Sequence, residues 1–585
     1  MKALIKNITS VAICSCMVLS CFACTADENA QASDKKTSPP FIRLECELPE
    51  LWGDKTILSS ARIKATGEVL PISFAYDDAV YVQTDLDSDL IEGFVAEEPE
   101  NYKDVSVESN YAFSTKFWTV RGVFGGDGDG NFRGEDFISR AEAVAVISRF
   151  LGIKAGSDTN SGFSDVAHDS WYAPIVTEAK KAGIISADNL FRPDDKVLRQ
   201  EFFTMACRAF DALGWLKNSR NAEYEILDMD KADLYAQQAY KKLIASGFYI
   251  DRVSRDEQTG GEGINAEYGY YLDPKENMKR GDASELLYWG LSDLPVVPSK
   301  AAMLMGFDKE MPIIDGSTSS YPITEVLYWQ FFNNANNHTK RPAAHSKTIN
   351  SYKRLISGEA DVIFVPDPNE EVEKLAKESG VELSYTPIAD EALIFFTSVK
   401  NNTEGLTTDQ IKNIYVDNKH TNWSEFGGPD KKLIPFCRNN DSGSHAQMEK
   451  FFLEGKEINE DIKRENTSVM MASILTDVIS SDTKNQDSYA LGYSMFYYFK
   501  NAGMVLGVTD PNGNDMLKLL AVDGIMPTKD SISNRTYPLS THYYAVLRSD
   551  EPDDSPARKI AELLSSPAGA ALVEQAGFGA VNADN

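Results

Sequence analysis

The chain has 585 residues, of which 42% are hydrophobic and 25% charged, and its formal net charge is -30 at pH 7. One hydrophobic core cannot serve this length, so we expect about three or four domains. No basic stripe offsets the acidic balance, which argues against a nucleic-acid-binding protein. Four of the seven cysteines lie within the first 24 residues and the other three are far apart, so they give no disulfide framework.

The N-terminus has the features of a targeting segment. Lysines precede an apolar run at 8–19 that is too short to span a membrane. The run leads into the letters VLSC, which resemble a bacterial lipobox, where a peptidase cuts before a cysteine that is then lipidated. We expect a signal peptide at 1–20 and lipidation of Cys21, with Cys24 the weaker candidate and an ordinary secretory signal the alternative. Residues 21–40 are polar and predict a flexible tether.

Residues 41–110 contain strand-like runs such as VLPISFAY and AVYVQTDL. Apolar and polar residues alternate within these runs, and turn residues separate them. The pattern predicts a small β-rich module at the N-terminal side of the chain, and its sequence does not indicate a function.

Residues 111–292 repeat themselves with a period of about 60 residues. The clearest copy, 163–210, predicts a helix that ends at Gly183, a turn with the letters NLFRPDDKV, and a second amphipathic helix. An earlier copy ends near 152, and a later copy is interrupted by an insertion. The middle of the chain is therefore predicted to be α-helical.

These copies resemble the S-layer homology repeat, whose pattern is F-x-D-V, W-Y, G-I, F-x-P and a final T-R-A-E-like motif. The resemblance implies that the final motif lies in a groove that receives an anionic cell-wall polymer, and an arginine fork suits an acid group. The alternative is that these residues cap helices and pair across repeats. The candidate polymer-binding residues are Ser139, Arg140 and Glu142 in the first copy, Arg199 and Glu201 in the second, and Arg280 and Asp282 in the third.

The letters GDGDGNF place acidic and amide side chains at alternate positions, as calcium loops do. An EF-type loop needs glycine at its sixth position and glutamate at its twelfth. Those positions hold Phe132 and Ile138 here. We therefore expect a turn before a repeat helix and no metal site.

Residues 293–304 form a linker with two prolines, and after it the texture changes to alternating strands and helices, typical of an α/β domain. The letters MPIIDGSTSSYPITEVLYWQFF predict a short strand, a Gly/Ser/Thr turn and an amphipathic helix. Unpaired N–H groups at a helix N-terminus bind anions, and small hydroxyl side chains add donors. The candidate anion-binding residues of this turn are Thr318, Ser319 and Ser320.

The letters CRNNDSGSHAQMEKFF, at 437–452, predict a second turn of small polar residues before a helix, here with an arginine added. Arg438 follows a predicted strand, and Ser442, Gly443 and Ser444 lead into a predicted amphipathic helix. A tetrahedral oxyanion could take two oxygens on the arginine fork and others on the serine hydroxyls and helix N–H groups. Stripping water from such an anion is costly, so nearly every oxygen must find a donor.

This region resembles the phosphate-binding proteins of ABC importers, which have a two-lobed, type II solute-binding fold. Their motif R-x-x-x-S-G-T is matched from Arg438 to Ser444, and their first loop, G-S-T-S, from Gly316 to Ser319. The stretch LTTDQIKNIYVDNKHTNWSEFGG, at 406–428, also fits the family. The resemblance covers about 305–585 and implies capture of phosphate by hinged closure of two lobes, followed by delivery to an ABC permease.

Two features depart from that family. The second loop, HSKTINSYKRLISG, has no glycine at its start and offers the polar side chains of Ser346, Thr348 and Asn350, of which Thr348 is the candidate anion-binding residue. The family's aspartate, which accepts the proton of hydrogen phosphate, is matched by Asp367 only if one residue is inserted. This leaves the choice between phosphate and sulfate open, because that choice depends on a proton acceptor.

No catalytic set competes with this interpretation. His445 lies beside the anion loop, but no Ser/His/Asp order or metal-ligand spacing is present. The sequence predicts a multidomain protein that is lipid-anchored at the extracellular face of the cell membrane and associated with the wall of a Gram-positive-type cell. We expect it to bind phosphate and to have no enzyme activity and no cofactor. The alternative is a structural or adhesive surface protein whose binder domain has lost transport or binds another ligand.

Overall fold

The computed structural model describes residues 38–48, 57–186, 188–216, 226–248, 255–258, 268–366, 368, 370–439, 442–468, 471–484, 487–505 and 515–581. The described residues form two compact units. One contains 38–304 and 329–339, and the other contains 305–328 and 340–581. The predicted signal peptide, Cys21, Cys24 and nearly all of the predicted tether lie outside the described residues.

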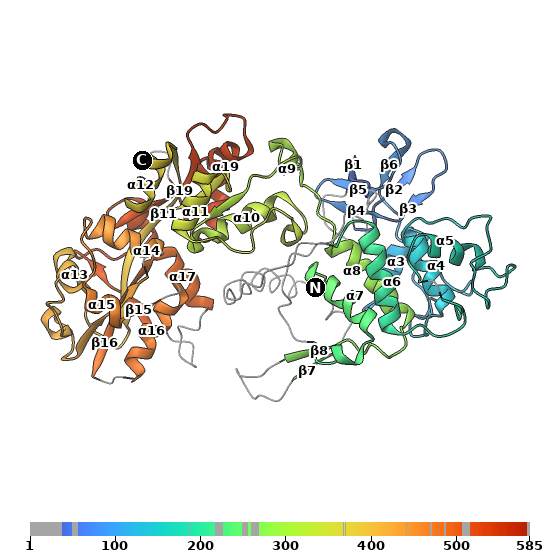
Figure 1. Cartoon of the computed structure of the whole chain (residues 1–585), viewed down its shortest axis with the longest axis horizontal. Helices are drawn as coiled ribbons and strands as arrows, with labels where there is room; N and C mark the ends of the chain where they lie inside the picture. Colours follow the sequence, from blue (N-terminus) through green and yellow to red (C-terminus); the bar gives the residue numbers. More distant parts are fainter. Residues whose placement is uncertain are drawn as a thin grey trace. The chain divides into compact units, whose positions relative to one another are not determined.

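The first unit begins with two small antiparallel sheets, as the alternation in its sequence predicts (Figure 1). One has the order β1-β5-β4 and the other β3-β2-β6. Their strands are β1 (Phe41–Glu45), β2 (Ser60–Ile63), β3 (Val69–Leu70), β4 (Ser73–Tyr76), β5 (Ala79–Gln83) and β6 (Ile91–Phe94). The expected β-rich module is therefore present.

Arg121 joins this β-rich module to the repeats. Its buried guanidinium donates hydrogen bonds to the carbonyl oxygens of Ser59 and Ser73, each at 2.9 Å, and lies over the ring of Phe117. Burial lowers the pKa of Arg121 to about 9, so it stays charged at neutral pH. The module and the first repeat helix thus share one buried cation.

The repeats fold as three helix pairs around a pseudo-threefold axis. The amide of Ile138 donates to the carbonyl of Met278 (3.0 Å), that of Met278 to Val197 (2.8 Å), and that of Val197 to Ile138 (3.1 Å). This closed cycle uses one residue from each copy, so the interrupted third copy takes the same place as the others. The helices are α3 (Ala112–Val120), α4 (Arg140–Phe150), α5 (Ala173–Lys181), α6 (Arg199–Ala212), α7 (Leu234–Ala245) and α8 (Arg280–Asp293).

The GDGDGNF segment is a turn closed by its own first aspartate. The Asp127 carboxylate accepts hydrogen bonds from the amides of Asp129 (2.9 Å) and Asn131 (3.1 Å). Across the described part of the chain, no group of three or more His, Cys, Asp or Glu side chains is placed to hold a metal ion.

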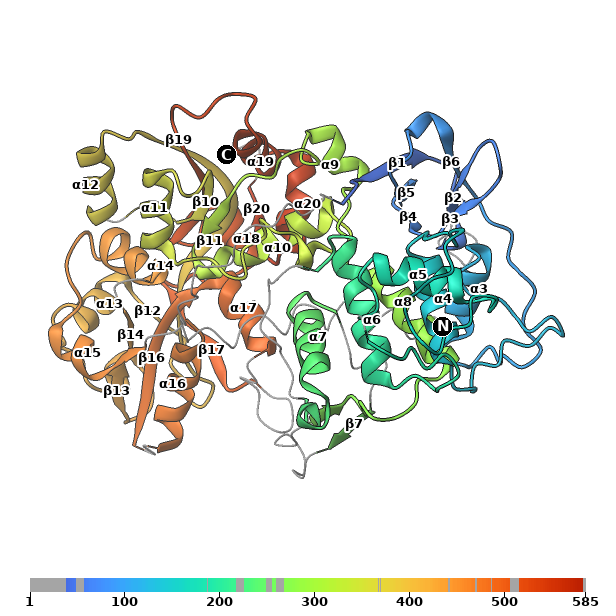
Figure 2. The same cartoon turned by 45° about the vertical axis from the view of Figure 1, so that its right-hand side comes forward.

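The second unit is built on a mixed eight-stranded sheet with the order β13-β16-β11-β19-β10-β9, on which β17 and β20 also pair with β11. Strand β10 is parallel to β9 and antiparallel to β19, and helices pack beside the sheet (Figure 2), which confirms the predicted α/β fold. The strands are β9 (Ile314–Gly316), β10 (Val362–Val365), β11 (Leu383–Ser398), β13 (Lys432–Pro435), β16 (Ser488–Met495), β17 (Leu517–Leu519), β19 (Ser540–Arg548) and β20 (Gly579–Ala580).

Strand β11 divides this unit into two lobes and connects them. Its first part, 383–392, pairs with β19, and its later part, 393–396, pairs with β16. Lobe one therefore contains β9, β10 and β19, and lobe two contains β13 and β16. The helices used below are α10 (Tyr321–Phe331), α11 (Thr348–Ser357) and α12 (Glu370–Ser379) in lobe one, and α14 (Gly443–Ala446), α16 (Met471–Lys484) and α17 (Phe496–Val505), which follow strands of lobe two.

Replacing Arg121 with methionine should destabilise the first unit by about 2–4 kcal/mol, because several buried carbonyl groups lose their donor. Differential scanning calorimetry of the full chain measures this change. Lys154→Ala is the matched control, since Lys154 is exposed and pairs with Glu68 at the surface, where such pairs contribute little. Equal unfolding temperatures for the Arg121 and Lys154 variants would contradict the role given to Arg121.

Candidate functional site

The first anion loop follows β9 as a short 3-10 turn, Thr318–Ser320, before α10 begins. Thr318 is exposed. The buried hydroxyl of Ser319 is hydrogen-bonded to that of Tyr543 on β19 and lies 3.1 Å from that of Ser317. Ser320 is fully buried, and its hydroxyl lies 2.6 Å from the carbonyl oxygen of Phe364, to which it donates. Ser320 therefore holds the turn against β10, and Ser319 and Thr318 remain the candidates for ligand contact.

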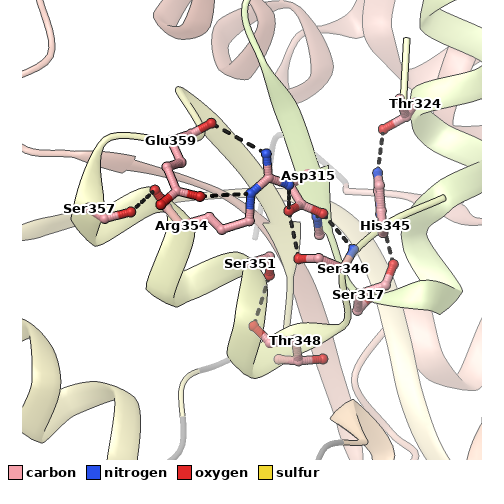
Figure 3. A network of polar contacts seen from close by, with 11 residues as sticks. Asp315, Ser317, Thr324, His345, Ser346, Thr348, Ser351, Arg354, Ser357 and Glu359 are labelled. Atoms are coloured by element: carbon pink, nitrogen blue, oxygen red, sulfur yellow. Dashed lines mark hydrogen bonds and ion pairs between the residues drawn. The ribbon is translucent and has the colours of Figure 1, made fainter. Parts of the chain in front are cut away.

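Asp315, at the centre of β9, fixes the second loop to the first (Figure 3). Its buried carboxylate forms an ion pair with Arg354 of α11 and accepts hydrogen bonds from Ser346, at 2.8 Å from the amide and 2.6 Å from the hydroxyl. The sequence analysis did not single out Asp315. The available signal was an aspartate inside a buried strand that runs straight into a Gly/Ser turn.

His345 reinforces the same connection from the other side of the loop. Its Nδ1 lies 2.8 Å from the carbonyl oxygen of Ser317, and its Nε2 lies 2.9 Å from the hydroxyl of Thr324. Burial lowers the pKa of His345 to about 4, so the imidazole is neutral at pH 7. A neutral ring with its proton on Nδ1 satisfies both partners, one as donor and one as acceptor.

Thr348 is the first residue of α11 and lies at the N-terminal end of that helix (Figure 3). Its hydroxyl oxygen is buried and has no hydrogen-bond partner. A buried hydroxyl without a partner is uncommon in proteins and calls for an explanation, such as a ligand. Thr348 stays a predicted anion-binding residue, and a hydroxyl without a partner is compatible with that role.

In lobe two, Arg438 ends β14 (Cys437–Arg438) and is 95% buried, with only 5% of its surface exposed. Its amide donates to the hydroxyl of Tyr493 at 3.0 Å. Burial lowers the pKa of Arg438 to about 10, while Tyr493 and Tyr498 act in the opposite direction. The guanidinium remains charged at neutral pH, and a bound anion would offset part of its desolvation cost.

Ser442 and Ser444 are also buried, and their hydroxyl oxygens lie 2.9 Å apart. Gly443 begins α14, which is a single turn and is followed by a π-helix over Gln447–Phe452. The sequence predicted one amphipathic α-helix here. π-helical turns are rare and are frequently found at functional sites. The π-helix therefore makes this segment a candidate for a functional role.

His445 is held as a partner of Glu449. Its Nε2 lies 3.2 Å from the Glu449 carboxylate, and its Nδ1 lies 3.2 Å from the Tyr493 hydroxyl. Burial opposes ionisation of Glu449, but hydrogen bonds from His445 and from the Ile458 amide outweigh burial and lower the pKa of Glu449 to about 2. His445 therefore contacts Glu449 and Tyr493 and helps to hold the loop in place.

Glu391 lies on β11 where this strand passes between the lobes. It is fully buried, and its Oε1 accepts hydrogen bonds from the amides of Ala392 (2.9 Å) and Tyr497 (3.2 Å). Burial raises the pKa of Glu391 to about 8, so it carries a proton at neutral pH. The neighbouring Asp390 is instead paired with Arg535 at 3.1 Å. The sequence analysis missed Glu391, because an acidic pair inside an apolar strand gives no indication of which carboxylate is paired.

The predicted anion-binding residues come from both lobes. Figures 1 and 2 both place α14, from lobe two, near α11, from lobe one. Asp367 lies outside the described residues.

The repeat motifs cap their own helices and connect adjacent copies. Ser139 and Glu142 form a capping box, and the Glu201 carboxylate accepts the amide of Leu198 at 2.9 Å. Arg140 pairs with Glu201 at 2.8 Å, and Arg199 pairs with Asp282 at 3.6 Å. In the third copy, Arg280 donates to the carbonyl oxygens of Phe132 and Gly125. The side chain of Arg140 keeps 19% of its surface exposed and that of Arg199 only 7%, so the first copy is more open to a ligand.

Comparison with known families agrees with these two architectures. Residues 311–566 match the model described as the PBP superfamily domain, and residues 118–144 and 162–203 match that of the S-layer homology domain. The chain carries a periplasmic-binding-protein domain behind S-layer homology domains. The third copy falls outside the matched ranges, and its equivalence is visible in the backbone cycle described above.

Individual relatives match one part or the other. The phosphate-binding protein PstS of Borreliella burgdorferi is 27% identical over 282 residues, which are 45% of this chain and 88% of that protein. Amylopullulanase of Thermoanaerobacterium thermosulfurigenes is 29% identical over 170 residues, and the cellulosome-anchoring protein of Acetivibrio thermocellus is 26% identical over 136 residues. The chain spans only 8% and 30% of these last two proteins.

Solved structures match slightly less than half of the chain. A phosphate transport receptor of the ABC type from Vibrio cholerae is 21% identical, with a TM-score of 0.34, and the match covers 46% of this chain and 98% of the receptor. PstS from Borrelia burgdorferi is 22% identical, with a TM-score of 0.32, and the match covers 47% of this chain and all of that protein. No helix in the described ranges has both the length and the apolar character needed to cross a membrane.

Glu391 predicts a pH dependence of stability. Its folded pKa of about 8 lies above the ordinary 4.5, so the folded state holds a proton that the unfolded state releases, and stability falls as pH rises between these values. Glu391→Gln should remove that part of the slope, at most about 1.4 kcal/mol per pH unit. Urea unfolding of the full chain at pH 5, 6.5 and 8 measures it. Glu378→Gln on the exposed face of α12 is the control, and parallel pH profiles for both variants would contradict the assignment.

Proposed function

We propose that the second unit binds an inorganic oxyanion, phosphate above others, between its two lobes, and that the chain presents it at the cell surface. The observation that carries the proposal is that one short segment of lobe two holds both the buried, charged guanidinium of Arg438 and the buried hydroxyls of Ser442 and Ser444. Burying a cation and hydroxyl groups in a protein interior is costly, and a tetrahedral anion would offer acceptors to both kinds of donor.

Binding would proceed by closure of the lobes over the anion. Arg438, Ser442 and Ser444 would bind it from lobe two, and Ser319, Thr318 and Thr348 from lobe one. The Ser442 and Ser444 hydroxyls, now bonded to each other, would turn toward the ligand. Strand β11 runs between the lobes and would provide the hinge for such a motion. No covalent step is needed, which agrees with a binding protein and not an enzyme.

Phosphate is favoured over other oxyanions because the relative that covers 45% of the chain is a phosphate-binding protein. Asp367, known here from sequence alone, is our choice for the acceptor of the proton on hydrogen phosphate. We further propose that the captured ion passes to an ABC permease and that lipidated Cys21 holds the chain at the membrane. The S-layer homology domains would bind an anionic wall polymer through Arg140 in particular, because that arginine is the more exposed.

Removing the Arg438 side chain should weaken phosphate binding about ten- to a hundred-fold, because a charge-assisted hydrogen bond is lost. Isothermal titration calorimetry of the full chain with Arg438→Ala measures this effect, with sulfate as the competing anion. Arg464→Ala is the matched control, since Arg464 pairs with Asp461 at the surface of the same lobe. Undiminished phosphate affinity in Arg438→Ala would show that the site is wrong.

Wall binding should depend on Arg140 more than on Arg199. Arg140→Gln should reduce co-sedimentation of the chain with purified cell walls several-fold and keep the fold, because one partly buried ion pair, with Glu201, is lost. Arg199→Gln should chiefly lower the unfolding temperature, since this side chain is buried. Walls that retain Arg140→Gln as well as the unaltered chain would contradict a polymer site at the first copy.

A further inference from the structure

Lys347, in the second loop of lobe one, has a backbone conformation that glycine adopts far more easily. Its φ is 76° and its ψ is 162°, a region that is nearly restricted to glycine and costs other residues free energy. Both neighbours hold it there. Ser346 is hydrogen-bonded to Asp315 through its amide and its hydroxyl, and Thr348 begins α11. The absence of glycine that the sequence analysis noted in this loop therefore has a structural cost.

The side chain of Lys347 does not offset that cost by pairing with the protein. It is exposed, and no carboxylate of the described residues forms an ion pair with its ammonium. Another lysine of the adjoining helix behaves differently, since Lys353 pairs with Glu371 at 2.9 Å. Among the described residues, Lys347 thus combines a strained backbone with an ammonium that has no carboxylate partner.

The surroundings of Lys347 favour an anion as that ligand. Thr348, the next residue, has a buried hydroxyl without a partner, at the start of a ten-residue helix whose first N–H groups carry positive partial charge. His345 of the same loop is held neutral between Ser317 and Thr324, so it adds no charge. Without Lys347, the second loop of lobe one would offer the anion only neutral hydrogen-bond donors.

We propose that the ammonium of Lys347 is a second cationic ligand of the oxyanion site, opposite Arg438, and that the glycine-like backbone is retained because it places this charge at the start of α11. The inference rests on the proposed function, and it makes the site a two-cation clamp for a divalent tetrahedral anion. An arginine fork from lobe two and a point charge from lobe one would together balance two negative charges.

The test separates the charge from the backbone. Phosphate affinity of the full chain is measured by calorimetry for Lys347→Gln, Lys347→Gly and Lys347→Arg at low and high salt, with Lys353→Gln as the matched control on α11. We expect Gln and Gly to weaken binding about three- to ten-fold at low salt, with a smaller loss at high salt because the charge is exposed. Arg should retain most of the affinity, and Lys353→Gln all of it.

The unfolding temperature gives the second readout. Lys347→Gly should unfold at a higher temperature than the unaltered chain, because the strain is removed, although its phosphate affinity falls. A residue with a merely structural role would not change stability and affinity in opposite directions. If the unaltered chain binds phosphate and all four variants bind it equally well, this inference alone is overturned. If the unaltered chain binds neither phosphate nor sulfate, the proposed function is overturned together with it.

Discussion

A doubly charged oxyanion leaves water only where nearly every one of its oxygens meets a donor, and the site proposed for the second unit depends on this constraint. The donors must be collected from distant parts of the chain and held before the ligand arrives. In lobe two, this is done by burying Arg438 with Ser442 and Ser444. Burial removes water from the Arg438 guanidinium and lowers its pKa, and a π-helix follows the loop shortly afterwards. Both features are unfavourable in isolation and become reasonable when an anion is the partner.

In lobe one, a network of buried polar residues holds the two loops in place without itself being a predicted part of the anion site. Asp315 ties the two loops together, and neutral His345 fixes their spacing. This network leaves Lys347 and Thr348 at the start of α11, next to each other in the chain. The buried carboxylic acid of Glu391 lies between the lobes, where it joins β11 to the start of α17 without adding a negative charge at neutral pH. An ionised carboxylate there would oppose the binding of an anion.

Sequence reasoning reaches features whose chemistry and spacing are local. The run from Arg438 to Ser444 and the Gly/Ser turn after β9 are each contained in a few residues, so an anion-binding role could be predicted for them from the sequence, and that role stays a prediction. It did not find Asp315, His345 or Glu391, because their importance depends on burial and on partners from other strands. Ser320 was chosen for its hydroxyl, but a carbonyl of a neighbouring strand engages that hydroxyl. The missing glycine was noticed from sequence, yet only the backbone of Lys347 shows how the loop manages without it.

The first unit shows the same division. The sequence period revealed the repeats and the arginines of their motifs. It did not reveal the threefold cycle of hydrogen bonds or the burial of Arg121, because each joins residues far apart in the chain. The arginine and acidic residues of the motifs serve as caps and as links between copies, and a groove at Arg140 is compatible with those contacts.

Hydrogen exchange of the full chain, with and without phosphate, tests the central claim most directly, because it reports on both lobes in one experiment. The account predicts slower amide exchange at 345–350 and at 442–448 when phosphate is present, and no such change with an equal concentration of chloride. Slowing in only one of these segments would contradict a clamp formed by two lobes. Unchanged exchange in both would contradict the oxyanion site altogether.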